Sequence, residues 1–191
     1  MPLATIPPTH LSRSTADGER GAGTHPPGDA ASAPAPSSGL PVTAECVIPP
    51  EWTDYNGHMN ELHYMEAAAR ANDRFMEMIG ADAAYVDAGR SYFTAENHIC
   101  YLGEMKAGEQ LRVTTQVLIG QGKKMLLFHR ILNGAGEVCA TVESMQLHVD
   151  LATRKTCPPG AQVAENLGAW AAAHAALPRP RQAGRGIGAP R

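Results

Sequence analysis

Apolar residues recur along the middle of the chain with two different periods. From Leu62 to Ile79 they fall every three to four residues, which is the period of a helix with one buried face. Asn60, a favoured cap residue, comes before this segment and Gly80 comes after it, so we predict one helix of about 20 residues between them. Four alanines within the segment would let a sheet approach closely, which indicates a central position for the helix.

After this helix the pattern changes to alternation of apolar and polar residues, which is the period of a strand. One short strand is predicted before the helix, at Val42–Val47, and residues 82–89 are predicted to form a loop. Glycines separate the later strands by short links, so we expect each strand to pair antiparallel with the next, as a meander. A second helix, rich in alanine and anchored by Trp170, is predicted over Ala161–Ala176 on the outside of the domain. The later strands are predicted at Tyr92–Leu102, Gln110–Ile119, Lys124–Leu132 and Glu137–Val149.

These elements predict an α+β fold in which a curved antiparallel sheet of about five strands wraps one long central helix. A single domain is expected over residues 41–178, since 191 residues suffice for one sizeable core. Residues 1–40 are rich in Pro, Gly and Ser, have no aromatic residue and are predicted to be disordered. Residues 179–191 are predicted to be a flexible tail, with four Arg and no acidic residue.

Charge and composition exclude several classes of protein. The predicted domain has 10 basic and 16 acidic residues once both ends are set aside, and such an acidic domain is a poor nucleic-acid binder. The chain has no run of 18 apolar residues and no secretory signal pattern, which predicts a cytoplasmic protein without a membrane span. Its four cysteines are widely spaced, so neither a disulfide framework nor a zinc site is expected. We predict no metal and no other cofactor.

The segment from Trp52 to Asn60, which we call the acid loop, has the composition of a reactive site. Asp54 precedes a bend at Asn56–Gly57, and the long helix begins directly after the loop. The first N–H groups of a helix carry partial positive charge and can stabilise an oxyanion. Asp54 beside a carbonyl held there would act as a nucleophile or as a base that activates water. The alternative interpretation of Asp-Tyr-Asn-Gly is a plain turn, for which these residues are favoured.

The order of elements resembles the hotdog fold, and the residues resemble its 4-hydroxybenzoyl-CoA thioesterase-like branch over about residues 42–155. The most specific match is the run from Asp54 to Asn60, with Tyr64 four residues further on. Residues 94–104, which include Glu96 and Glu104, are similar to the second-strand pattern of many acyl-CoA hydrolases in that family. The form Trp-Thr-Asp-Tyr-Asn-Gly-His-Met-Asn looks closest to betainyl-CoA thioesterases of bacterial carnitine catabolism.

The resemblance implies an acyl-CoA thioesterase that is a homodimer or homotetramer, with active sites at the dimer interface. Asp54 falls on the family's catalytic carboxylate, and the backbone N–H of Glu61 falls where the thioester oxygen is held. Asn60 caps that helix start, and His58 is expected to organise the loop. The candidates for the partner chain's contribution are Glu96, His98 and the Lys123–Lys124 turn.

The aromatic residues Trp52, Tyr55 and Tyr64 are the predicted walls of the acyl site, because ring faces attract a quaternary ammonium. Ordinary packing around the helix start is the alternative for each ring. Lys123, Lys124 and Arg130 are the candidates for binding the anionic CoA. The predicted reaction is therefore hydrolysis of betainyl-CoA to glycine betaine and CoA. Other short or aromatic acyl-CoAs, a hydratase using His58 or His98 with Glu96, and a non-catalytic acyl-CoA sensor remain alternatives.

Overall fold

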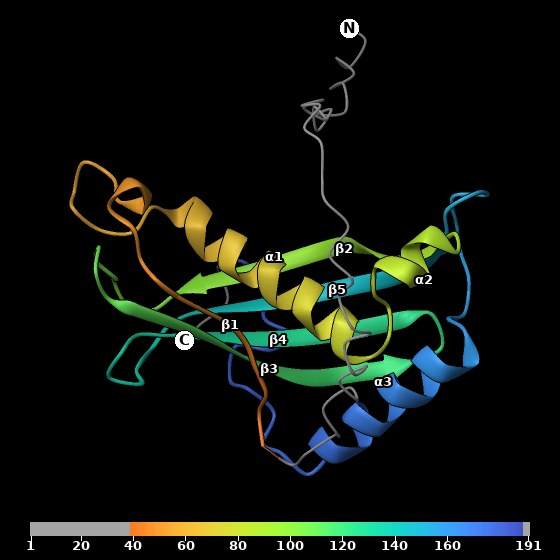
Figure 1. Cartoon of the computed structure of the whole chain (residues 1–191). Coiled ribbons are helices and arrows are strands. Elements are labelled where there is room, and N and C mark those ends of the chain that lie inside the picture. Colours follow the sequence, from red (N-terminus) through yellow and green to blue (C-terminus); the bar gives the residue numbers. More distant parts are fainter. Residues whose placement is uncertain (1–38, 189–191) are drawn as a thin grey trace, which may run out of the picture. The chain divides into compact units, whose positions relative to one another are not determined.

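The computed structural model describes residues 39–188, so the predicted disordered segment lies almost wholly outside the described residues. An antiparallel sheet carries a long helix across one face, and two further helices lie at its end (Figure 1). A short 3-10 helix, η1, precedes the long helix. The elements are β1 Val42–Val47, η1 Pro50–Trp52, α1 Glu61–Met78, α2 Ala83–Asp87, β2 Arg90–Tyr101, β3 Gln110–Gln121, β4 Lys124–Leu132, β5 Val138–Asp150, β6 Lys155–Thr156 and α3 Ala161–His174.

The long helix α1 begins and ends where its periodicity predicts. The side chain of Asn60 accepts a hydrogen bond from the Leu62 N–H, which caps the first turn. Gly80 adopts a φ of +84°, in the left-handed region that ends a helix at little cost for glycine. The face with Ala67, Ala68 and Ala71 is buried, and these small side chains let α1 lie close to the sheet.

The strand order, β1-β3-β4-β5-β2, corrects the predicted meander. β3, β4 and β5 do pair in sequence, but β2 pairs with β5 and lies at the opposite edge from β1. The reason is the link of residues 102–109, which is too long for a hairpin turn. Its start bonds to β5, where Leu102 donates to the carbonyl of Cys139, and its end bonds beside β1, where Gly108 donates to that of Ile48. The link therefore crosses from one edge of the sheet to the other.

Two further elements differ from prediction. The expected loop at residues 82–89 contains α2, because the Asp82 side chain accepts a hydrogen bond from the Tyr85 N–H and caps a short helix. The two-residue strand β6 adds to the edge of β5 near its end. The other predicted strands and helices end within two residues of their observed limits.

A layer of buried polar side chains lies between two apolar clusters in the core, on the sheet face that packs against α1. We call this the helix face and the opposite one the outer face. Along β3, Thr115 separates Val113 of one cluster from Val117 of the other, and Asn72 does the same on α1 between Ala71 and Phe75. Strands β1, β3, β4 and β5 contribute to the layer. Its members are Thr43, Asn72, Thr115, His129, Ser144 and Gln146.

His129 is the centre of this polar layer and is completely buried. Its Nε2 lies 2.9 Å from Oδ1 of Asn72, and its Nδ1 lies 2.9 Å from the Thr115 hydroxyl. The Asn72 amide nitrogen donates to Ser144, so Asn72 Oδ1 accepts from His129 and the imidazole is neutral with its proton on Nε2. Burial lowers the pKa of His129 to about 3.

The C-terminal helix and the chain after it lie against the sheet. Trp170 of α3 is buried edge-on against Phe75, with ring centroids 5.9 Å apart, so the predicted anchor packs into the core. After α3 the chain passes to the outer face. There Pro178 accepts a hydrogen bond from Gln116 at 3.3 Å, and the Gly184 N–H donates to Glu143 at 2.6 Å.

We predict that the free energy of unfolding falls as the pH is lowered from about 6.5 to about 5. His129 binds a proton near pH 6.5 when unfolded but stays neutral when folded, so acid favours the unfolded state by about 1.4 kcal/mol per pH unit for one such group. Burial also lowers the pKa of His148 and of His174, which adds to this slope. The free energy of unfolding is measured by urea titration at several pH values. It should change less with pH in His129→Gln than in the unmodified protein, and an equal change with pH would contradict the assignment.

Candidate active site

The acid loop is closed by its own backbone before it meets the rest of the fold. Thr53 and Met59 form an antiparallel bridge, and the Asp54 N–H donates to the His58 carbonyl at 2.9 Å. Gly57 has a φ of +77°, a conformation that side chains other than glycine rarely adopt. These bonds form a tight loop whose tip is Tyr55 to Gly57.

Two contacts fix the acid loop on the core. The Met59 N–H donates to the Met105 carbonyl at 2.7 Å, which joins the loop to the crossing link between β2 and β3. Trp52 stacks on His63 of α1 with ring centroids 4.7 Å apart, and the Arg70 guanidinium lies 5.6 Å from the Trp52 ring centre. The loop is therefore held both by the first turns of α1 and by the link beneath them.

The carboxylate of Asp54 is half-buried and makes the contacts of a turn residue. Its Oδ1 accepts from the Asn56 backbone N–H at 2.8 Å, and its Oδ2 lies 3.4 Å from the Asn56 amide nitrogen. The turn interpretation is thus correct for the loop's local structure. The same carboxylate also faces a cavity, so the two interpretations are compatible.

The start of α1 presents a backbone donor at this cavity. The Leu62 N–H is taken by the Asn60 side chain, and the His63 N–H bonds to the Asn60 carbonyl at 3.0 Å. Within residues 39–188, the N–H of Glu61 makes no hydrogen bond. An unpaired N–H at a helix N-terminus is suited to hold an oxyanion.

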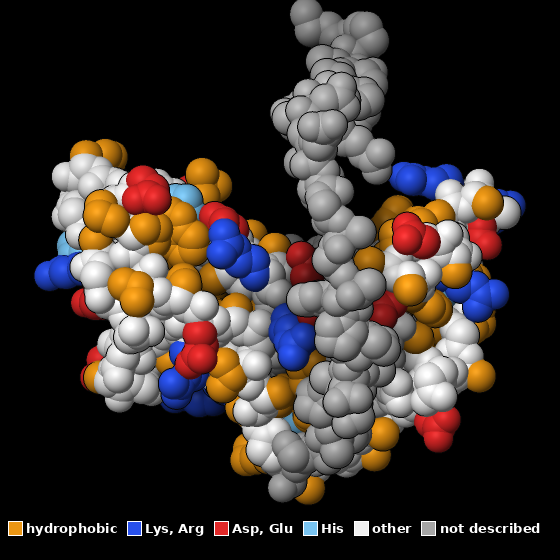
Figure 2. All heavy atoms as spheres, in the orientation of Figure 1, with side chains coloured by type: hydrophobic (Ala, Val, Ile, Leu, Met, Phe, Trp, Pro, Cys, Tyr) orange, Lys and Arg blue, Asp and Glu red, His pale blue; other side chains and the backbone are white. Residues whose placement is uncertain are grey.

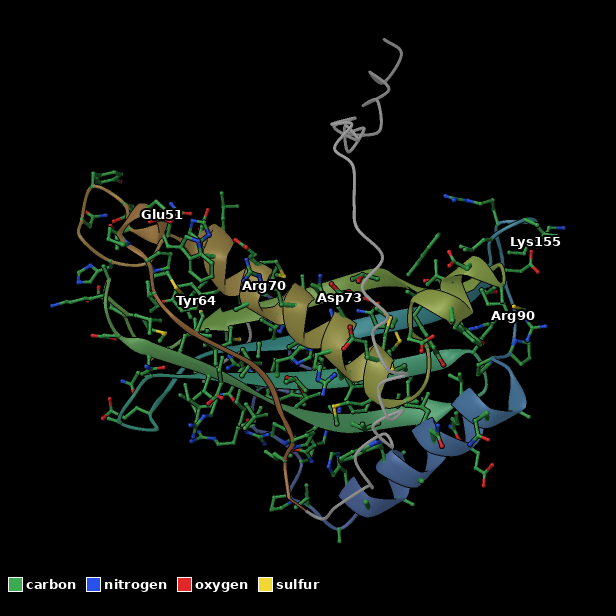
Figure 3. All side chains as sticks on the ribbon, in the orientation of Figure 1. Glu51, Tyr64, Arg70, Asp73, Arg90 and Lys155 are labelled. Carbon is green, nitrogen blue, oxygen red and sulfur yellow. The ribbon has the colours of Figure 1, made fainter. Side chains whose placement is uncertain are left out.

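A cavity of about 570 Å³ brings these groups together. It lies between the acid loop, the start of α1 and the end of β2, at the end of the sheet where Figure 3 labels Glu51 and Tyr64. Figure 2 shows acidic and histidine side chains among hydrophobic ones at this end of the molecule. The lining residues are Asp54, Asn56, His58, Met59, Glu61, Tyr64, Tyr101, Gly103 and Glu104.

The cavity combines negative charge with aromatic surface. Asp54, Glu61 and Glu104 line it, and His58 Nε2 lies 3.2 Å from a carboxylate oxygen of Glu104. The ring of Tyr64 packs edge-on against that of Tyr101, with centroids 5.5 Å apart.

The two tyrosine hydroxyls of the cavity are neutral and donate to backbone carbonyls. Tyr64 donates to Gly103 and Tyr101 donates to Glu61, each at 3.4 Å. Burial raises the pKa of Tyr64 to about 12, and burial followed by the nearby Glu61 charge raises the pKa of Tyr101. Both therefore remain protonated at neutral pH and can present ring faces without adding charge.

Not every predicted aromatic wall lies at this cavity. Tyr64 lines it, whereas Trp52 is 9% exposed and packs between His63 and Arg70. Tyr55 is 98% exposed at the tip of the acid loop. Tyr101, which we did not assign to the site from sequence, takes the place of these two rings in the cavity wall.

The strand candidates lie away from the cavity of their own chain. Glu96 pairs with Met145 and His98 pairs with Glu143, positions that alternate with the helix-face residues Val142 and Ser144, so both point to the outer face. Of the groups considered for a hydratase, Glu96 and His98 do not line the cavity that Asp54 lines, whereas His58 does.

The candidates for CoA binding are also remote. Lys123 donates to Thr156, beside Lys155, and Figure 3 places Lys155 at the end of the sheet opposite Tyr64. Lys124 follows Lys123 as the first residue of β4. Arg130 lies on the outer face, where it donates to the Gln116 side chain at 3.0 Å. The chain alone does not bring these cations to the acid loop.

Within residues 39–188, no three His, Cys, Asp or Glu side chains are grouped so as to hold a metal ion. None of the helices in that part of the chain is long and apolar enough to cross a membrane.

Comparison with known proteins agrees with this architecture. The family model described as "Thioesterase-like superfamily" matches residues 48–167, and the chain belongs to this family. A putative thioesterase from Pseudomonas putida KT2440 is 31% identical, with a TM-score of 0.68 over 80% of this chain and 99% of that one. The predicted hotdog fold is confirmed.

Two curated relatives carry more specific names. L-carnitine dehydrogenase/betainyl-CoA thioesterase from Ruegeria pomeroyi is 51% identical over 149 residues, which are 78% of this chain and 30% of that protein. Betainyl-CoA thioesterase from Pseudomonas aeruginosa is 40% identical over 151 residues, 78% of this chain and 95% of that one. The chain thus spans less than a third of the Ruegeria protein's length but almost all of the Pseudomonas protein's.

Proposed function

We propose that the chain is an acyl-CoA thioesterase that hydrolyses betainyl-CoA to glycine betaine and CoA. The observation that carries the proposal is the placement of the Asp54 carboxylate and the unpaired Glu61 N–H at one cavity. The names of the Ruegeria and Pseudomonas relatives support the choice of substrate.

The thioester oxygen would accept a hydrogen bond from the Glu61 N–H as negative charge develops on it. A donor of this kind contributes roughly 3 to 4 kcal/mol in measured cases. In one route a carboxylate oxygen of Asp54 attacks the carbonyl carbon, the C–S bond breaks, and water then hydrolyses the mixed anhydride. In the other, Asp54 takes a proton from water as the water oxygen adds to that carbon. Either route consumes one water and releases a carboxylate and the CoA thiol.

The composition of the cavity favours a cationic acyl group. A trimethylammonium head is attracted by ring faces such as those of Tyr64 and Tyr101. The carboxylates of Glu61 and Glu104 add favourable charge without being consumed by the reaction. A neutral acyl group of the same shape would gain contact area there but no such attraction.

We predict that Asp54→Asn lowers kcat by roughly a hundredfold or more, the usual scale for losing an acid–base group. The amide oxygen of Asn can still accept from the Asn56 N–H, so the turn is kept while the negative charge is lost. Steady-state kinetics with betainyl-CoA measure the effect. The exposed Glu51→Gln next to the loop is the matched control, and near-normal turnover in Asp54→Asn would refute the assignment.

We predict that Tyr101→Leu lowers the ratio of kcat/KM for betainyl-CoA to kcat/KM for 3,3-dimethylbutanoyl-CoA. In the second substrate, carbon replaces the cationic nitrogen. One lost cation–ring contact of about 0.5 to 2 kcal/mol corresponds to a change in the kcat/KM ratio of roughly 2- to 30-fold. Tyr55→Leu removes an equal ring from the same end of the molecule but outside the cavity, so its ratio should match that of the unmodified protein. An unchanged ratio in Tyr101→Leu would remove this ring from the acyl site.

We also infer that two chains pair through β2. Within residues 39–188, β2 is bonded on one edge to β5, and its residues 93–97 are exposed. A two-fold axis makes the paired strands antiparallel, so the partner's Arg90 would lie beside Tyr101 of the first chain. The partner's Lys123 and the partner's Lys124, at that same end of the sheet, would then approach the acid loop from across the interface.

The dimer gives a simple expectation for the mass in solution. Size-exclusion chromatography with light scattering should give twice the 20.2 kDa of one chain, or a multiple of that dimer. Dilution to low concentration should leave the mass unchanged, since an active site shared between chains requires a stable interface. A monomeric mass at full activity would contradict a shared site.

A further inference from the structure

The tail after α3 and the end of β2 enclose a second cavity, of about 650 Å³. On the strand side it is lined by His98–Leu102, and on the tail side by residues 181, 182 and 185–188. Two of these tail residues are arginines, Arg181 and Arg185. The match to the family model ends at residue 167, before these tail residues.

The tail is hydrogen-bonded to the outer face at Pro178 and at Gly184. Gln116 donates to the Pro178 carbonyl, and the other end of the same amide accepts from Arg130, so β3 and β4 both hold the tail's start. Turns follow, in which the Ala183 N–H donates to Pro180 and the Gly184 N–H donates to the carboxylate of Glu143. The chain after α3 (dark blue in Figure 1) thus continues along the sheet toward the acid-loop end.

The second cavity adjoins the catalytic one. Tyr101 lines both, and the chain passes directly from Leu102 in the second cavity to Gly103 in the first. A ligand that reaches past Tyr101 would therefore contact Asp54 and Glu61 with one end and the tail with the other. The first cavity carries three carboxylates and the second carries two guanidinium groups.

This charge separation matches a ligand with a cationic or neutral end and a phosphorylated end. Guanidinium groups bind phosphate oxygens through paired, charge-assisted hydrogen bonds. Leu102, which is exposed, gives the same cavity an apolar surface suited to a flat ring. We propose that Arg181 and Arg185 bind the phosphates of the nucleotide half of CoA, which rests on the proposed function.

The alternative location for these phosphates is the end of the partner's sheet where β3 connects to β4. There the partner's Lys123 and the partner's Lys124 would supply the charge. The tail site differs because its arginines belong to the chain that also supplies Asp54. Variants of the two groups therefore separate the two locations.

The experiment is titration of the full chain with free CoA by isothermal calorimetry, which needs no turnover. The double variant Arg181→Ala with Arg185→Ala should raise the Kd for CoA by roughly tenfold or more, the usual scale for losing charge-assisted bonds to phosphate. It should also flatten the dependence of Kd on salt concentration. Arg179→Ala changes the same charge in the same tail but outside the cavity, and it should leave the Kd unchanged.

A second arm uses the N-acetylcysteamine thioester of betaine, which has no phosphates. The double variant should hydrolyse it at the rate of the unmodified protein, while its KM for betainyl-CoA rises. Dephospho-CoA, which lacks the 3′-phosphate, then shows which phosphate the arginines bind. If the unmodified protein binds CoA more tightly than dephospho-CoA and the double variant binds both equally, the arginines bind the 3′-phosphate. If the double variant keeps the difference, they bind the pyrophosphate.

The proposal is overturned if the double variant binds CoA as tightly as the unmodified protein, or if Lys123→Ala with Lys124→Ala alone weakens binding. Absence of hydrolysis with intact, arginine-dependent CoA binding would instead contradict the proposed function and leave the phosphate site standing. The two failures are therefore distinguishable.

Discussion

The hydrogen bonds of buried His129 are the constraint on which the position of the active site depends. They link Asn72 of α1 to Thr115 of β3, and Asn72 continues the chain of bonds to Ser144 of β5. Apolar packing alone tolerates sliding of a helix along a sheet, whereas buried polar groups that lose their partners cost about 1 to 3 kcal/mol each. The polar layer therefore sets where α1 lies along the sheet, and hence where its first N–H groups point.

Two residues of the acid loop each have one role in the structure of the loop and a second role at the cavity or at the helix start. Asp54 holds the turn through Asn56 and faces the cavity, while Asn60 closes the loop against Trp52 and caps α1. Because Met59 is bonded to the crossing link, the loop also follows any movement of residues 102–109, which supply Glu104. The proposed catalytic carboxylate and the proposed oxyanion donor are thereby held by one connected set of hydrogen bonds.

The sequence could predict that Asp54 and the start of α1 lie together, because they are close in the chain. Periodicity and a cap residue located the helix start, and both Asp54 and Glu61 line one cavity. The position of β2 could not be predicted, because strand order depends on where the link of residues 102–109 finds partners, at Cys139 and Ile48. Tyr101 ends β2, 40 residues after Glu61 in the chain, so its ring could be assigned to the cavity wall only once the fold was known.

Charge along the ligand gives a physical reason for two separate cavities. The groups that suit a trimethylammonium head, carboxylates and ring faces, repel or fail to bind phosphates, so one pocket cannot serve both ends of betainyl-CoA. The domain has a net negative charge, so its overall electrostatic field does not attract phosphates. A separate group of basic side chains is therefore needed to bind them. In the proposed site, Arg181 and Arg185, which follow the part of the chain matched by the family model, would provide such an anchor without altering the acid loop.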